Sequence, residues 1–167
     1  MLLAFMVTDS SVRSNIALIN FFEVLHNRSY QYLTSSVLNG QEKKQAFEDV
    51  RKIPEMIHRN ELILEPIESM KEAMRKHIAK DLLPKEQQIT ESEVLQKIYE
   101  GIVAYMCLEG LYFSGGFVYF HSLARDQKMN GSNDLINLIK KDENIHSSFF
   151  GLLIQVLMRE FPELATE

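Results

Sequence analysis

Apolar residues recur along most of the chain at the three- and four-residue spacing of amphipathic helices. No stretch alternates apolar and polar residues for long enough to predict a strand. The pattern therefore predicts an all-α fold. Five helical segments are expected, over residues 2–12, 15–38, 41–80, 91–129 and 132–161.

Prolines and capping residues define the expected ends of these segments. Pro54 and Pro66 mark starts or kinks within the third segment, because proline fits the first turn of a helix and breaks its interior. Residues 81–90 are expected to form a loop. Thr90 and Glu93 then match a capping box, which starts the fourth segment.

The fourth segment is interrupted by Ser114-Gly115-Gly116. Each glycine costs about 1 kcal/mol relative to alanine in the interior of a helix. Two adjacent glycines indicate either a π-bulge near a functional site or a close contact with another helix, and the sequence leaves both open.

Length and composition predict a single domain over residues 1–167. Hydrophobic residues make up 46% of the chain and charged residues 25%, as is ordinary for a soluble globular protein. The net charge of −5 gives no electrostatic reason to expect nucleic acid as a partner. Cys107 is the one cysteine of the sequence, so no internal disulfide can form and a reducing, cytoplasmic location is expected.

Glu109 lies inside the longest apolar stretch of the sequence, residues 102–123. A membrane-spanning helix would place this carboxylate in hydrocarbon at a cost of a few kcal/mol, so no membrane span is expected. The start of the chain also lacks the basic flank of a secretory signal. Glu109 must therefore be neutralised inside the protein.

Two segments place a glutamate and a histidine three residues apart, namely Glu23 with His26 and Glu143 with His146. Residues at this spacing share one face of a helix, so their side chains can bind the same metal ion. Core histidines paired with glutamates would show the same spacing. The apolar residues around both pairs favour the metal-binding interpretation.

The other histidines are expected to have different surroundings. Glu55 and His58 have the same spacing, but they follow Pro54 in a polar segment, where a solvated face is expected. His77 and His121 have no partner at ligand spacing, so a structural role is expected for each.

A complete two-metal site needs two further carboxylates. Two Glu-x-x-His helices, together with one carboxylate from each of two other helices, hold two iron or two manganese ions in four-helix bundles. Asp9 and Glu109 can supply the single carboxylates, and four carboxylates would balance two divalent cations. The predicted ligands are Asp9, Glu23, His26, Glu109, Glu143 and His146.

The order of these motifs resembles the small subunit of class I ribonucleotide reductase. Glu23-Val24-Leu25-His26-Asn27-Arg28-Ser29-Tyr30 is similar to the family's first Glu-x-x-His motif, which a tyrosine follows four residues after the histidine. Asp142-Glu143-Asn144-Ile145-His146 is similar to the second motif, Leu108-Glu109 to the intervening helix, and Thr8-Asp9-Ser10 to the first-ligand motif. The resemblance covers nearly the whole chain and implies a ferritin-like di-metal four-helix bundle with extra helices.

The resemblance also implies roles for residues around the metals. Tyr30 would carry a stable radical, formed with two iron ions (or manganese) and O₂, and a separate large subunit would use this radical to make deoxyribonucleotides. Asp142 would hydrogen-bond the free ring nitrogen of His26, and a homodimer is implied. The apolar pocket around the radical would be Phe113, Phe117 and Ile139. Tyr30 taken alone is also compatible with a core tyrosine whose hydroxyl is bonded.

Three departures from the family pattern bear on these expectations. Only thirteen residues separate Asp9 from Glu23, where the family has a longer stretch, so a tight hairpin around residues 13–16 would have to bring Asp9 to the site. The sequence has no tryptophan for long-range radical transfer. It is also expected to lack the family's tyrosine-bearing C-terminal tail.

Two other functions remain open from the sequence. A stand-alone ferritin-like di-metal oxidase would bind metal and consume O₂ without a lasting radical on Tyr30. An inactive, metal-free helical scaffold would bind no metal and would lose no stability when Glu143 is changed to alanine.

Overall fold

The structure is a computed structural model that describes residues 3–165, and every regular element in this range is helical. The prediction of an all-α fold is confirmed. The α-helices are α1 (Leu3–Met6), α2 (Ser10–Val37), α3 (Gly40–Val50), α4 (Pro54–Ile78), α5 (Glu91–Cys107), α6 (Phe113–Arg125) and α7 (Asn130–Glu160). A π-helical segment, η3 (Leu108–Tyr112), joins α5 to α6, and short 3₁₀ turns are η1 (Lys80–Leu82), η2 (Lys85–Gln87) and η4 (Pro162–Ala165).

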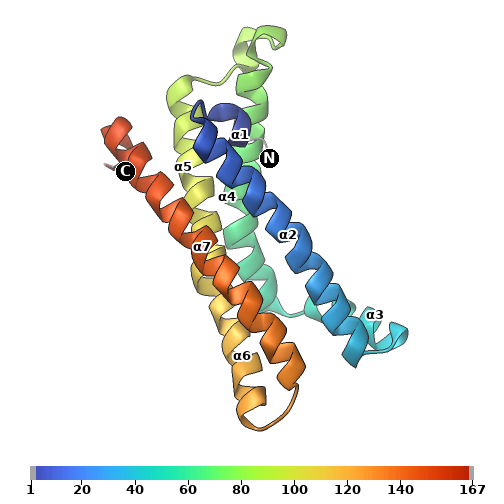
Figure 1. Cartoon of the computed structure of the whole chain (residues 1–167). Coiled ribbons are helices and arrows are strands. Elements are labelled where there is room, and N and C mark those ends of the chain that lie inside the picture. The colour runs from blue at the N-terminus through green and yellow to red at the C-terminus, as the bar shows by residue number, and fades with distance from the viewer. Residues whose placement is uncertain (1–2, 166–167) are drawn as a thin grey trace.

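The long helices form a bundle in which α2 and α7 lie in front of α4 and α5 (Figure 1). α5, η3 and α6 follow one another without a break and form one long helical segment. α3 lies at one end of the bundle, and the turns around residues 80–90 lie at the other. The expected four-helix bundle with extra helices is therefore observed.

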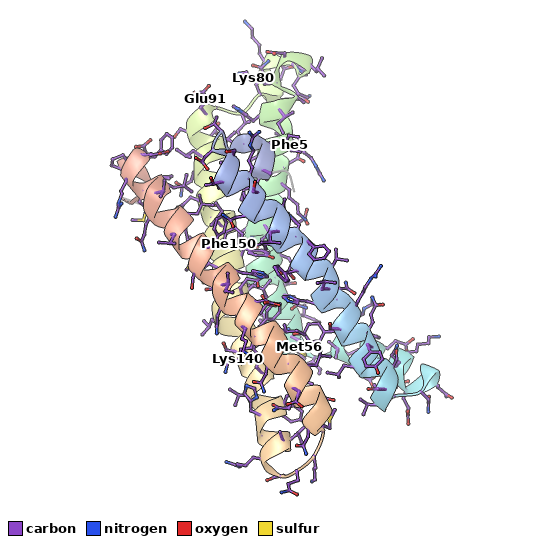
Figure 2. The ribbon with its side chains drawn as sticks, viewed as in Figure 1. Phe5, Met56, Lys80, Glu91, Lys140 and Phe150 are labelled. Carbon is purple, nitrogen blue, oxygen red and sulfur yellow. The ribbon has the colours of Figure 1, made fainter. Side chains whose placement is uncertain are left out.

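An apolar core joins the helices of the bundle. Its buried side chains recur at helical spacing, as Val94, Ile98 and Ile102 do on α5 and Phe150 and Ile154 do on α7. Figure 2 shows Phe150 inside the bundle. Burying each large apolar side chain stabilises the fold by about 1.5–3 kcal/mol, so this core determines how the helices are arranged around the site.

Most helix ends follow the capping signals in the sequence. Thr90 and Glu93 form the expected capping box, with the Thr90 amide 2.8 Å from the Glu93 carboxylate. Pro54 occupies the first turn of α4, whereas Pro66 lies inside that helix. The expected single segment 41–80 is therefore two helices, separated before Pro54. Residues 81–90 connect α4 to α5, as expected.

The N-terminal part of the chain differs from the prediction. The helix expected over 2–12 ends at Met6, and Leu2 lies outside the described residues. Asp9 has an extended backbone and caps α2, because its carboxylate accepts hydrogen bonds from the amides of Ser11 and Val12 at 2.8 and 2.9 Å. The hairpin expected around residues 13–16 does not exist, since these residues lie inside the continuous helix α2.

The π-helical distortion of the long segment α5–η3–α6 also lies elsewhere than expected. The π-helical turn is η3, whereas Gly115 and Gly116 lie within the regular helix α6. A Cβ atom at either glycine would meet no other atom within 4 Å, so close helix contact does not explain them either. The close approach is at Gly110, where a Cβ would lie 2.5 Å from the Ser147 hydroxyl oxygen of α7. This contact sets η3 directly against α7.

Two glycine substitutions should have opposite effects on stability. A Cβ at Gly101 would lie 2.7 Å from the Cβ of Met70, and no side-chain rotation relieves that clash. We expect Gly101→Ala to lower the free energy of unfolding by about 1–3 kcal/mol. Gly115→Ala should raise it by up to about 1 kcal/mol, because alanine favours the helix and the space is open. Urea denaturation measures both, and equal effects would contradict the packing described.

Candidate metal centre

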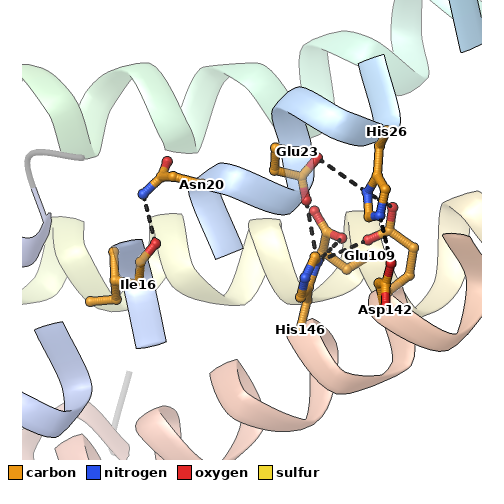
Figure 3. Close-up of polar contacts among 8 residues, drawn as sticks. Ile16, Asn20, Glu23, His26, Glu109, Asp142 and His146 are labelled. Atoms are coloured by element: carbon orange, nitrogen blue, oxygen red, sulfur yellow. Dashed lines mark hydrogen bonds and ion pairs between the residues drawn. The ribbon is translucent and has the colours of Figure 1, made fainter. Parts of the chain in front are cut away.

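The two predicted Glu-x-x-His pairs lie on neighbouring helices and converge inside the bundle (Figure 3). Glu23 and His26 belong to α2, and Glu143 and His146 belong to α7. His26, Glu143 and His146 are only 4%, 1% and 1% exposed, whereas Glu23 is half-buried. Each pair reaches the interior because residues three apart share one face of a helix.

Glu143 lies between the two imidazoles. Its Oε1 atom is 3.1 Å from His26 Nδ1, and its Oε2 atom is 3.2 Å from His146 Nδ1. The two imidazole rings have their centroids 5.7 Å apart. One buried carboxylate therefore contacts the same nitrogen type of both histidines.

Two further carboxylates complete the cluster. Glu23 places one oxygen 3.2 Å from His146 Nδ1 and the other 3.9 Å from His26 Nδ1. Glu109, from the π-helical segment η3, places Oε2 at 3.5 Å from His146 Nδ1 and is 2% exposed. Three carboxylates from three different helical segments thus surround the two Nδ1 atoms.

The surroundings of Glu109 bear on the membrane question. By length and composition alone, the helical stretch Lys85–Arg125 is long and apolar enough to cross a membrane, a test that the core helix of a soluble protein also passes. Glu109 lies within this stretch, and its carboxylate points into the cluster. His146 places an imidazole nitrogen beside this buried carboxylate.

The donor set fits metal ions. Several buried polar atoms in the cluster lie at ion-pair distance from one another but form no well-aligned hydrogen bond among the described residues: Glu23 Oε1, His26 Nδ1, Glu109 Oε2 and Glu143 Oε1. Buried polar atoms without good hydrogen bonds lower the stability of the fold, so a group of them indicates that a bound cation completes the site. Carboxylate oxygens and imidazole nitrogens are ligands that divalent iron and manganese accept.

The electrostatics of the cluster favour protonated histidines. Burial opposes the charge of His146, but the nearby carboxylates of Glu109, Glu143 and Glu23 outweigh it and raise its pKa to about 11. Burial likewise opposes the charge of His26, whose pKa is nevertheless raised by Glu143 and Asp142. Burial raises the pKa of Glu109, whereas the hydrogen bonds from both histidines hold the pKa of Glu143 below its usual range despite burial.

Metal binding should therefore release protons. At pH 7 His146 carries a proton on the metal-free protein, and a metal ligand must give it up. We expect more than one and up to about three protons released per chain, because Glu109 and His26 also have raised pKa values and must lose their protons to bind metal. Mn(II) titration in weakly buffered solution measures this release. Release near zero would contradict this electrostatic account.

The same pKa shift predicts the pH dependence of the metal-free fold. The pKa of His146 is raised from 6.5 to about 11, so its contribution to stability is full below about pH 6.5 and is lost as the pH rises towards 11. The melting temperature in chelator should accordingly fall between pH 7 and pH 10, and a flat profile would count against the shift.

Asp142 contacts the outer nitrogen of His26. Its Oδ2 atom lies 3.1 Å from His26 Nε2, and its side chain is 30% exposed. A carboxylate at this position orients the imidazole and leaves Nδ1 free to face the cluster. This is the contact that the resemblance implied.

Tyr30 is shielded on one side. It packs against a buried cluster that contains Phe117 and Ile139, with Phe113 also against it. On its other side Tyr30 lines an open cleft of about 570 Å³, together with Glu23, His26 and Glu143 among others. Burial is still sufficient to raise the pKa of Tyr30 to about 12, so its phenol is neutral at pH 7.

The structure does not bring Asp9 to the cluster. Asp9 caps the start of α2, fourteen residues before Glu23, which is about 21 Å along a helix axis. Its carboxylate is exposed and already accepts two backbone hydrogen bonds. The prediction of Asp9 as a metal ligand is therefore wrong for this structure.

The remaining histidines lie outside the cluster. Glu55 and His58 are both exposed on α4, as expected for a solvated face. His121 Nδ1 lies 2.7 Å from the Asn133 side-chain oxygen, and this contact joins α6 to α7. His77 lines a cleft at the other end of the bundle.

Three residues near the site were not predicted. Leu33 and Ile136 are buried in the cluster against which Tyr30 packs. Burial, together with the neighbouring Glu109 carboxylate, raises the pKa of the Tyr105 phenol, and the ring of this tyrosine packs edge-to-face on Phe150. Helical spacing could have indicated all three, since Leu33 follows Tyr30 by three residues, Ile136 precedes Ile139 by three and Tyr105 precedes Glu109 by four.

Known proteins resemble this chain in sequence. A beta subunit of ribonucleoside-diphosphate reductase from Halalkalibacterium halodurans is 33% identical over 161 residues, which is 96% of this chain and 41% of that protein. The corresponding subunit of Treponema pallidum is 26% identical over 160 residues, 96% of this chain and 40% of that protein. This chain thus spans about two fifths of the length of these relatives.

A solved structure and a family match agree with these relatives. A crystal structure assigned to class I ribonucleotide reductase, from Bacillus halodurans, superimposes with a TM-score of 0.75 at 33% identity, covering 97% of this chain and 51% of that one. Residues 3–167 match the family described as ribonucleotide reductase, small chain. The chain belongs to the ribonucleotide reductase small-chain family and has its ferritin-like helical fold.

Proposed function

We propose that this chain is the metal-binding core of a ribonucleoside-diphosphate reductase small (beta) subunit. The observation that supports this most directly is the convergence of ligand atoms from Glu23, His26, Glu143 and His146, all within 4.8 Å of one another. Because the chain spans only 41% of its relative from Halalkalibacterium halodurans, the activity and partners of the whole protein belong to the proposal.

Two iron ions would be held by five residues of the cluster. Two manganese ions could take their place, because manganese also binds carboxylate oxygens and imidazole nitrogens. Glu143 can offer one oxygen to each side of the cluster because it lies between the imidazoles. Without Asp9, four carboxylates still lie in or next to the cluster. Three are proposed ligands, and the fourth is Asp142, which contacts His26 Nε2. Their four negative charges would balance two divalent ions. The proposed ligands are Glu23, His26, Glu109, Glu143 and His146.

Tyr30 would carry the radical. With the ions bound, O₂ would be the oxidant for a one-electron oxidation of Tyr30. Reduction of O₂ to water takes four electrons: two would come from the two Fe(II) ions, one from Tyr30 and one from an external reductant, and the reduced oxygen would take up the phenol proton. The phenol is neutral at pH 7, so it must lose a proton together with the electron. The side chains of Phe117 and Ile139 would keep water and reductants from one side of the ring.

Membership of the family supports a proposal for the assembly around this core. A large subunit would use the radical to reduce ribonucleotides, which supplies deoxyribonucleotides for DNA replication. We further propose a cytoplasmic homodimer that binds neither nucleic acid nor membrane. The net charge of −5 is consistent with the absence of a nucleic-acid partner.

Adding Fe(II) to the chain without oxygen and then admitting O₂ tests this proposal. We expect about two ions bound per chain and then a tyrosyl signal in the electron paramagnetic resonance spectrum. Absence of iron uptake would refute the proposal and support a metal-free helical scaffold.

A stand-alone di-metal oxidase is the second candidate. The open cleft beside Tyr30 favours it, because a tyrosyl radical exposed to water and reductants does not last. Iron uptake and O₂ consumption without a tyrosyl signal would support this candidate over the radical-bearing subunit.

A further inference from the structure

The open side of Tyr30 has a large apolar residue beside it that the metal centre does not use. The cleft of about 570 Å³ next to Tyr30 is also lined by Phe47 of α3. Phe47 is 59% exposed, although the rings of Tyr30 and Phe113 line the same cleft. An exposed phenylalanine gains free energy when it moves from water into contact with apolar neighbours. Closure of α3 over the cleft would give Phe47 such contacts.

α3 is held weakly to the rest of the bundle. It buries none of its side chains, whereas α2 and α4 on either side of it each bury several. Among the residues that the structure describes, one side-chain hydrogen bond joins α3 to another helix, from Lys43 Nζ to Ser35 Oγ on the surface. Figure 1 shows α3 at the end of the bundle, beside the C-terminal end of α2. A helix without buried anchors can open and close at a low cost in free energy.

Short non-helical segments on both sides of α3 can act as hinges. Leu38 and Asn39 have extended backbones between α2 and α3. Ile53, between α3 and α4, is extended as well. Hinges are commonly a few residues at the ends of elements, which absorb the change in backbone angles. α3 can therefore turn as a unit while α2 and α4 stay in place.

We propose that α3 is a lid, and that its closure places Phe47 against the open side of Tyr30. Phe117 and Ile139 already belong to the buried cluster on the other side of this ring. In the closed arrangement, apolar side chains would therefore exclude water and reductants from both sides of the phenol. Closure depends only on α3 and the cleft, whereas its benefit to a radical on Tyr30 rests on the proposed function.

Hydroxyl-radical footprinting tests the closure on the metal-free chain in chelator. Radiolysis of water produces the hydroxyl radicals, and peptide mass spectrometry measures how fast each side chain is modified. Phe21 on α2 is the reference, because it is 57% exposed and Phe47 is 59% exposed. If α3 closes, Phe47 should be modified about fourfold more slowly than Phe21, because burying its exposed part favours the closed state. Equal rates, or protection of Phe47 that disappears on dilution and so comes from a second copy, would overturn the lid.

Substitutions of Phe47 test whether it covers Tyr30. Phe47→Ala should raise the rate of Tyr30 modification about threefold, because the apolar contact that favours closure is lost. Phe47→Leu should restore most of the protection, since leucine is also large and apolar. Phe5→Ala is the matched control and should leave Tyr30 unchanged, because Phe5 is 75% exposed and lies at the other end of the bundle (Figure 2). An unchanged Tyr30 rate in Phe47→Ala would remove Phe47 from the cover.

The radical gives a second readout after iron loading and exposure to O₂. The tyrosyl signal of Tyr30 should form in Phe47→Ala to the same extent and decay several times faster, whereas in Phe47→Leu it should decay near the rate of the unmodified chain. Equal decay in all three chains would contradict a shielding role for Phe47. If no chain gives a tyrosyl signal, the proposed radical fails, and footprinting still decides whether α3 closes.

Discussion

Replacing Glu143 by alanine should reduce the affinity for Mn(II) or Fe(II) by more than about 100-fold. Replacing a residue that only hydrogen-bonds a metal ligand typically lowers metal affinity about 10–100-fold. Glu143 is itself a proposed ligand, and it contacts the Nδ1 atoms of both His26 and His146. The metal-free protein should also lose about 3 kcal/mol of unfolding free energy at pH 7, because His146 keeps its charge and loses a buried partner. Calorimetric titration and urea denaturation measure the two effects.

Glu55→Ala is the matched control for this substitution. Glu55 also precedes a histidine by three residues on a helix, but both side chains are exposed. Its replacement should leave metal affinity unchanged and alter stability by less than about 0.5 kcal/mol. Equal metal binding by the Glu143→Ala variant and the unmodified chain would remove Glu143 from the proposed centre.

Tyr30→Phe should abolish the tyrosyl signal and leave the number of bound ions unchanged. Tyr30 lines the same cleft as Glu23, His26 and Glu143. It is not one of the proposed ligands, so its replacement should leave the metal-binding residues in place. Phenylalanine keeps the ring that packs against Phe117 and removes the O–H that is oxidised. Electron paramagnetic resonance after iron loading and O₂ exposure measures the result.

Tyr32→Phe provides the control, because Tyr32 lies on the same helix and is 74% exposed. Its signal should match that of the unmodified chain. A signal that survives in Tyr30→Phe and disappears in Tyr105→Phe would assign the radical to Tyr105, which lies beside Glu109.

Local spacing was sufficient to predict the four side chains that converge in the cluster. Glu23 with His26 and Glu143 with His146 required only the period of a helix and apolar flanks. Both are properties of a few adjacent residues. The buried position of Glu109 followed in the same way, from one acidic residue in an apolar stretch.

The prediction for Asp9 failed because it depended on the path of the chain. Residues 10–22 contain no proline or glycine, so they continue one helix instead of turning back. Asp9 is also a strong helix cap, and this local preference fixed its role. The π-helical turn was misplaced for a similar reason, since the close contact of Gly110 with Ser147 depends on how η3 packs against α7.

Anomalous diffraction from crystals of the chain grown with Mn(II) most directly tests whether these residues form one two-metal centre. We expect two peaks about 3.5–4 Å apart, near Glu143 and the Nδ1 atoms of His26 and His146. Peaks confined to exposed groups such as His58, or no peak between α2 and α7, would contradict the proposed centre.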